Sequence, residues 1–164
     1  MSISQARRNG GRRGNAIIEF ALSATVLFTL LFGTFQFGYT FYVYDQLQTG
    51  VRSGVRYASL RPYQLGGGGC ATTIEGYVKN IVAYGNPSPG ANPLPIVKGL
   101  KPSNVKVVYT KDAAGKPTQV TVTVTGFEVD ALFQTFTFTD KPYATVPFFG
   151  RYAPTESCDY QPPA

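Results

Sequence analysis

The sequence predicts an α+β fold: a long N-terminal transmembrane helix extends into a small head that holds a second helix and an antiparallel β-sheet. Three observations predict it. Residues 20–44 form a run of 25 residues without a charged side chain. Apolar side chains continue at helical spacing after that run. A later segment, "TQVTVTVTG", alternates strictly between apolar and polar residues, which is typical of a half-buried strand.

The uncharged run from Phe20 to Tyr44 is long enough to cross a membrane. At about 1.5 Å per residue a helix of this length spans roughly 37 Å, against about 30 Å for the hydrocarbon core of a bilayer. The run also exceeds the apolar core of a signal peptide, about 7–15 residues, and no clear small-residue cleavage site follows it. We therefore expect one pass through membrane lipid.

A cluster of basic residues precedes this run on its N-terminal side. A positive flank stays in the cytoplasm, so residues 1–14 should be cytoplasmic and the region after Tyr44 should lie outside. Without these arginines the 15 basic residues fall to 11, nearly balanced by nine acidic ones, so nucleic acid is not an expected partner. The flanking residues are Arg7, Arg8, Arg12 and Arg13.

The first helix should continue beyond the membrane to Leu60, giving a helix over residues 16–60. Gly50 and Gly54 lie four residues apart, a spacing that favours close packing against another element. Pro62 and the glycine run 66–69 should end the helix. The predicted organisation is therefore a basic leader over 1–14, the long helix over 15–61 and a head over 62–164. One apolar face should consist of Leu47, Val51, Val55 and Ala58.

The head should begin with a second helix over residues 72–84, capped by Thr72 or Thr73. Residues 85–95 hold four prolines and two glycines, which predict an irregular loop.

The remainder of the head should be β-structure. Residues 105–110 and 118–129 should pair as antiparallel strands around the hairpin loop "KDAAGK", with Val120, Val122 and Val124 facing the core. A third strand is expected within residues 143–151. The sequence pattern of the segment "DALFQTFTF" is compatible with both a short helical turn and a strand.

Cys70 and Cys158 are the two cysteines of the chain, and both follow the apolar run. If the head lies outside the cytosol, they can form a disulfide, which would stabilise the fold by roughly 4–5 kcal/mol. The other interpretation is two unrelated buried thiols. Neither cysteine has a second Cys or a His at metal-ligand spacing, so no metal site is predicted.

No enzymatic activity is predicted, and no catalytic residue or cofactor site is expected. The chain has no His, no G-x-S-x-G motif and no phosphate-binding loop, since "LGGGGC" lacks the required lysine and spacing. Glu128 and Asp130 are close in sequence, but a solvated strand end explains them without an acid–base role.

The N-terminal 45 or so residues resemble the TadE-like proteins, minor pilins or pseudopilins of tight-adherence (Tad/Flp) pilus systems. The resemblance lies in Arg-Arg-Gly before the run, in "EFAL" at residues 19–22, in Gly33 and Gly38, and in "GVRSGVRYA" at residues 50–58.

The resemblance implies a role in pilus assembly or structure. A prepilin peptidase would cut between Gly14 and Asn15, making Glu19 the fifth residue of the mature chain. Glu19, followed by Phe20, would then guide assembly. A carboxylate in apolar surroundings is costly unless it is paired, and the new α-amino group, with a pKa of about 8, is a suitable partner on an adjacent subunit.

The implied partners are other pilin or pseudopilin subunits in an oligomeric assembly. The implied location is the bacterial cytoplasmic membrane, with the head in the periplasm or outside the cell and possible inclusion in a surface pilus. The alternative is a single-pass protein that is never cleaved and whose extracytoplasmic head binds a partner or acts as an adhesin.

Overall fold

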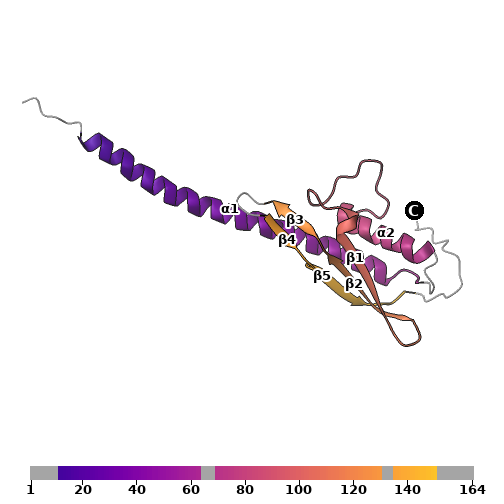
Figure 1. Cartoon of the computed structure of the whole chain (residues 1–164). Helices are drawn as coiled ribbons and strands as arrows, with labels where there is room; N and C mark the ends of the chain where they lie inside the picture. Colours follow the sequence, from indigo (N-terminus) through magenta and orange to yellow (C-terminus); the bar gives the residue numbers. More distant parts are fainter. Residues whose placement is uncertain (1–10, 64–68, 131–134, 151–164) are drawn as a thin grey trace, which may run out of the picture. The chain divides into compact units, whose positions relative to one another are not determined.

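The computed structural model describes residues 11–63, 69–130 and 135–150, and the side chains of residues 11–13 and 69–72 lie outside this description. The predicted α+β fold is confirmed (Figure 1). The chain forms two compact units, one ending at Tyr39 and the other beginning at Thr40. The described elements are α1 (Gly11–Ser59), α2 (Gly69–Tyr84), the 3₁₀ turn η1 (Pro102–Asn104), β1 (Val105–Lys111), β2 (Pro117–Val124), β3 (Phe127–Asp130), β4 (Thr135–Phe138) and β5 (Tyr143–Pro147).

The part of α1 in the second unit buries the predicted apolar face. Leu47, Val51, Val55 and Ala58 each expose 2% or less of their surface. They form a common core with Val78 and other apolar residues of α2 and with residues of the sheet. The helical spacing therefore predicted the inner face of this part of α1 correctly.

The two glycines on this face bring α1 and α2 close together. A Cβ atom added to Gly50 would lie 3.0 Å from the carbonyl oxygen of Val82, and one added to Gly54 would lie 2.7 Å from a methyl carbon of Val82. The missing side chains thus let α1 approach both the backbone and the side chain of α2. The predicted close packing at this pair is confirmed.

Helix α2 begins three residues earlier than predicted, at Gly69, so neither Thr72 nor Thr73 is its cap. It ends at Tyr84, as expected. Gly85 follows with φ +74, and its N–H donates to the carbonyl of Ile81 at 2.9 Å. Such a left-handed residue is the common way to close a helix, and glycine adopts it without steric cost. No helix or strand occurs in residues 85–95, as predicted.

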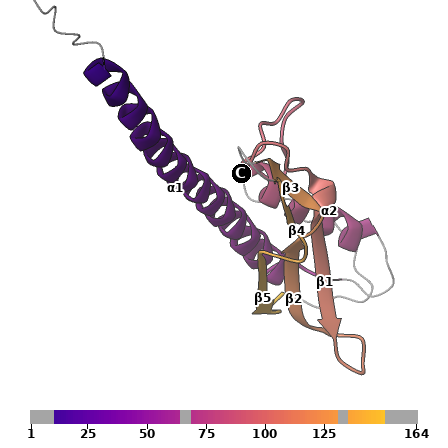
Figure 2. The ribbon, with the colours of Figure 1, turned by 60° about the vertical axis from the view of Figure 1, so that its left-hand side comes forward.

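Three strands form the main sheet in the order β1-β2-β5, with antiparallel neighbours (Figure 2). The predicted third strand is β5. Val120, Val122 and Val124 of the central strand are fully buried, which confirms their predicted direction. The hairpin loop is also confirmed: the Asp112 carboxylate accepts backbone N–H groups of Ala114 and Lys116 at 3.0 and 2.8 Å.

The prediction of one strand over residues 118–129 is wrong. Strand β2 ends at Val124, and Gly126 follows with φ +62, a left-handed conformation that turns the chain out of the ladder. The next residues form β3, which pairs with β4 in a separate two-stranded sheet. The ambiguous segment is therefore a strand over 135–138, while residues 131–134 lie outside the described residues.

The small sheet packs on α1 through aromatic rings. Phe138 stacks on Phe127 with ring centroids 6.4 Å apart, and its ring lies 6.1 Å from that of Tyr44 on α1. Asn104, at the end of η1, holds the link between the two sheets, because its side-chain amide donates to the carbonyl of Gly126 at 2.8 Å.

Candidate functional site

The predicted cleavage and pairing residues lie in the N-terminal unit. Gly14, Asn15, Glu19 and Phe20 are all exposed. Helix α1 begins at Gly11 rather than near residue 16, so it runs through the Gly14–Asn15 bond. A Cβ atom added to Gly14 would meet no heavy atom within 4 Å. A small substitution at Gly14 therefore meets no steric obstacle in the fold.

Glu19 follows Asn15 by four residues, so both lie on the same side of α1, one turn apart. Within the described part of the chain, Glu19 makes no hydrogen bond or ion pair. The side chains of Arg12 and Arg13 are outside the description. The arrangement leaves a carboxylate on the flank of an exposed helix, where a cation can reach it.

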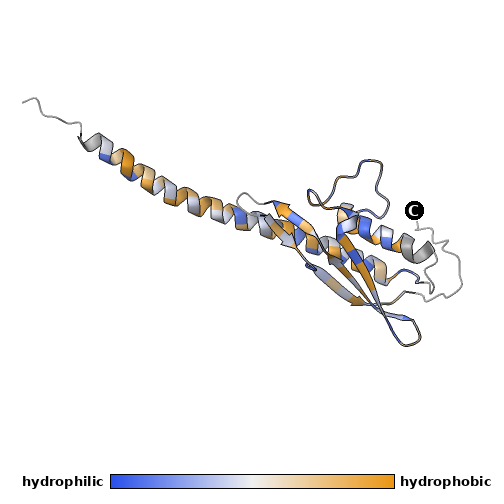
Figure 3. Cartoon of the chain, in the orientation of Figure 1, coloured by the Kyte–Doolittle hydropathy of each residue, from blue (hydrophilic) through white to orange (hydrophobic). Residues whose placement is uncertain are grey.

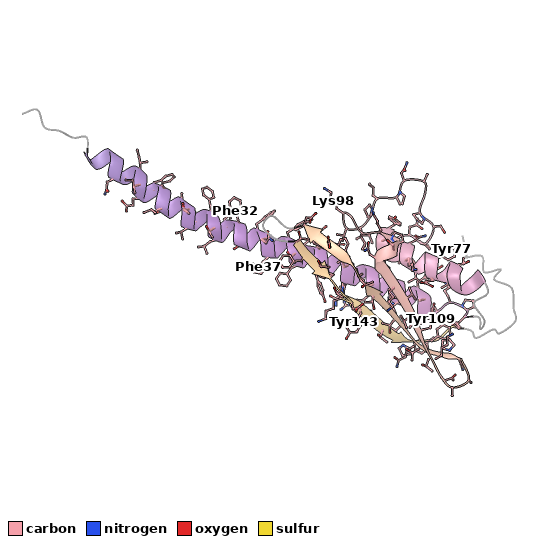
Figure 4. All side chains as sticks on the ribbon, in the orientation of Figure 1. Phe32, Phe37, Tyr77, Lys98, Tyr109 and Tyr143 are labelled. Atoms are coloured by element: carbon pink, nitrogen blue, oxygen red, sulfur yellow. The ribbon has the colours of Figure 1, made fainter. Side chains whose placement is uncertain are left out.

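Apolar side chains cover every side of α1 in this unit. Consecutive residues point about 100° apart around a helix, so Phe20, Phe28, Leu22 and Leu30 point at about 0°, 80°, 200° and 280° around the axis. They expose 74%, 52%, 67% and 66% of their surfaces. A helix that is apolar all round is stable when buried in protein or lipid. Figure 3 shows mainly orange and pale colours along this part of α1, and Figure 4 shows Phe32 and Phe37 projecting from it.

Hydroxyl groups in the same segment bond to the helix itself. Thr25, Thr29 and Thr34 each donate to the carbonyl oxygen four residues earlier, at 2.8–2.9 Å. These bonds pair the hydroxyls without a partner outside the helix, which lowers the cost of placing them in lipid. Among the described residues, α1 is the one helix that is long and apolar enough to cross a membrane.

Other candidate chemistry is sparse. Among residues 11–63, 69–130 and 135–150, no cluster of three or more His, Cys, Asp or Glu side chains could hold a metal ion. Cys158 lies outside the described residues, and Cys70 is described only as backbone of α2, so the disulfide stays a prediction. Glu128 and Asp130 are exposed on β3, and Asp130 accepts a hydrogen bond from Thr135 at 3.2 Å.

One titratable group of the head is strongly perturbed. Burial, with smaller contributions from Tyr63 and Glu75, raises the pKa of Tyr109 to about 12. Its ring lies 4.8 Å from that of Tyr63 and 6.3 Å from that of Phe148, centroid to centroid. This aromatic cluster packs the end of the sheet, and its chemistry fits a structural role.

Asp45 is a charged residue that the apolar patterning did not bring out. It is exposed on α1, as are Arg52 and Arg56. The signal that could have found it is its spacing of seven and eleven residues from these arginines, which places all three on one side of the helix.

The sequence was compared with known protein families. Residues 14–56 match the family model described as TadE-like protein. Comparison with curated proteins and with solved structures gave no match. The matched residues include the predicted cleavage site, the apolar segment and both packing glycines. Residues 14–56 are thus a TadE-like segment, as the resemblance predicted, and they indicate a membrane-anchored protein associated with a Tad pilus system.

Proposed function

We propose that this chain is a minor pilin or pseudopilin of a Tad/Flp-type pilus system, with a non-enzymatic role in pilus assembly or structure. A prepilin peptidase cuts after Gly14, and the apolar segment then joins the mature chain to other pilin or pseudopilin subunits. The head lies on the periplasmic or outer side of the cytoplasmic membrane.

One observation carries this proposal: residues 14–44 of α1 are apolar all round and hold a single carboxylate, Glu19, four residues after Asn15. A plain membrane anchor needs no acid at that position. In an assembly, the carboxylate of one subunit and the new α-amino group of its neighbour satisfy each other in apolar surroundings. That pairing also favours one register between the two helices.

Cleavage is tested by mass spectrometry of the protein from cells with an active prepilin peptidase. We expect a chain that begins at Asn15. Gly14→Ala should block processing, while Gly33→Ala should not, although neither added methyl group meets a neighbour within 4 Å. An intact chain that keeps Met1 would support the uncleaved, membrane-anchored binding protein instead.

Pairing is tested by Glu19→Gln, which keeps the shape of the side chain and removes its charge. We expect normal membrane insertion but at least tenfold less incorporation into the pilus assembly, because the α-amino group then loses its counter-charge. Glu128→Gln removes an exposed carboxylate from the head and serves as the control. Equal incorporation of both variants would contradict the pairing role.

A further inference from the structure

A loop with an exposed apolar side chain follows α2. Residues 86–95 hold four prolines and no charged residue, and we call them the proline loop. Leu94 in this loop exposes 88% of its surface, the largest exposed fraction among the large apolar side chains of the described residues. Such exposure is costly in water and indicates a site that another apolar surface covers.

Hydrogen bonds hold the proline loop to α2 at both ends. The side-chain amide of Asn80 donates to the carbonyl of Pro87 at 3.0 Å, and the N–H of Ile96 donates to the carbonyl of Ala83 at 2.8 Å. The position of the loop on the head is therefore fixed by the last turns of α2.

Two prolines flank the exposed side chain. Pro93 and Pro95 each have a fixed φ, and the residue before a proline is restricted to extended conformations, so the backbone on both sides of Leu94 is stiff. A stiff segment loses little conformational freedom when its side chain is buried against a partner.

The end of α2 lies close to the level at which the uncharged run of α1 ends. Helix α2 runs antiparallel to α1, because Gly54 lies against Val78 whereas Gly50 lies against the backbone of Val82. Tyr44, the last residue of the uncharged run, precedes Gly50 by six residues, which is about 9 Å along the helix axis.

The proline loop can cover the remaining distance to the lipid. A bilayer has a polar layer of about 5–8 Å on each side of its hydrocarbon core. Leu94 is two residues from Ile96 and can lie up to about 7 Å from it. Figures 1 and 2 show the loop beyond the C-terminal end of α2, at the same end of the head as β3. The small sheet at this end contacts Tyr44 through Phe138.

We propose that the proline loop rests on the membrane surface, with the side chain of Leu94 inserted into the lipid. The contact is continuous with the membrane interface of α1, where Phe41 and Tyr42 expose 72% and 61% of their surfaces. The inference rests on the anchoring of α1 in a membrane, and it needs neither leader cleavage nor a pilus. With α1 alone the head is free to rotate about the helix axis, and the second contact removes this freedom.

The apolar side chain rather than charge carries this contact. Lys98 and Lys101 are exposed just after the loop and favour an anionic surface, but Glu128 and Asp130 are exposed on β3 at the same end of the head and oppose it. Insertion should therefore occur in zwitterionic lipid and change little when anionic lipid is added.

The test uses the full chain in phosphatidylcholine nanodiscs. Because the chain has no tryptophan, Leu94→Trp places a single tryptophan in the proline loop. Brominated acyl chains should quench its emission at least about twofold relative to unbrominated lipid, since an inserted interfacial side chain reaches the boundary of the acyl chains. Ala113→Trp is the control: it is exposed in the hairpin loop between β1 and β2, and its emission should be the same in both lipids.

A second pair of variants tests Leu94 itself. Ala91→Trp reports on the same loop with the leucine retained, and adding Leu94→Asp should remove most of its quenching, because a carboxylate is costly to insert. Quenching of Leu94→Trp no stronger than that of Ala113→Trp would overturn the inference and leave the loop for a protein partner. Quenching of Ala91→Trp that Leu94→Asp does not change would also overturn it. Neither outcome affects the proposed function, which the mature N-terminus and the Glu19→Gln variant test separately.

Discussion

Replacing Gly54 by alanine tests the closest helix contact in the head. The added Cβ atom would lie 2.7 Å from a methyl carbon of Val82 and 3.4 Å from a methyl carbon of Val78. Both valines are buried, and a valine in a helix has one strongly preferred rotamer. The neighbours therefore cannot turn away, and the two helices must move apart.

The magnitude follows from two opposing effects. Alanine in place of glycine favours a helix by about 1 kcal/mol. Overpacking a tight core costs about 1–3 kcal/mol. Gly54→Ala should therefore change the free energy of unfolding by between about zero and −2 kcal/mol.

Gly76 on α2 offers a matched control, since a Cβ atom added there meets no heavy atom within 4 Å. Gly76→Ala should raise the free energy of unfolding by about 1 kcal/mol. The difference between the two variants, about 1–3 kcal/mol, then isolates the overpacking cost.

The assay is urea unfolding of the full chain in detergent micelles, followed by far-ultraviolet circular dichroism because the chain has no tryptophan. Val82→Ala should lessen the effect of Gly54→Ala, because it removes the methyl group that the new side chain meets. If Gly54→Ala stabilised the head as much as Gly76→Ala does, the close approach of α1 and α2 would be refuted.

Two further predictions concern the sheets. The pKa of Tyr109 in the folded head, about 12, is above its ordinary value of 10.0, so its contribution to stability is intact below pH 10 and is lost as the pH rises to 12. Between pH 10 and pH 12 the free energy of unfolding should fall by at most about 2–3 kcal/mol because of this group. Urea unfolding measured over this pH range should show a smaller fall for Tyr109→Phe. Asn104→Ala should cost about 1–2 kcal/mol in urea unfolding, because its amide bonds Gly126 and its side-chain oxygen accepts the N–H of Lys101 at 3.2 Å. Ser103→Ala, at an exposed neighbouring position, should cost little, and equal losses would show that the side-chain bonds of Asn104 are unimportant.

Local patterns predicted the faces of this fold better than its connections. Helical spacing identified the buried side of α1, and the interval between Gly50 and Gly54 indicated a close neighbour, which is α2. Strict alternation likewise identified the buried valines of β2. In each case the signal repeats over several residues, so one ambiguous position does little harm.

The strand break at Gly126 was missed because apolar and polar residues alternate on both sides of it. The buried positions nevertheless change phase between Val124 and Phe127, from even to odd numbers, and the chain changes sheets at this point. A lone glycine in a strand is a known sign of a bend. What fixes the bend is Asn104, 22 residues earlier, and no local pattern reveals a partner at that distance.

The site itself depends on a different kind of signal. In the N-terminal unit apolar side chains occur on every side of α1. This pattern predicts that the helix lies in lipid or in a protein interior, but it does not show which side faces a neighbouring helix. Glu19 is the one charged side chain within this apolar segment. A carboxylate among exposed apolar side chains needs a nearby cation, so its position indicates the level along the helix at which a partner must lie. The mature N-terminus at Asn15 of an assembled neighbour is the proposed cation, so its detection or absence beside Glu19 decides the proposal.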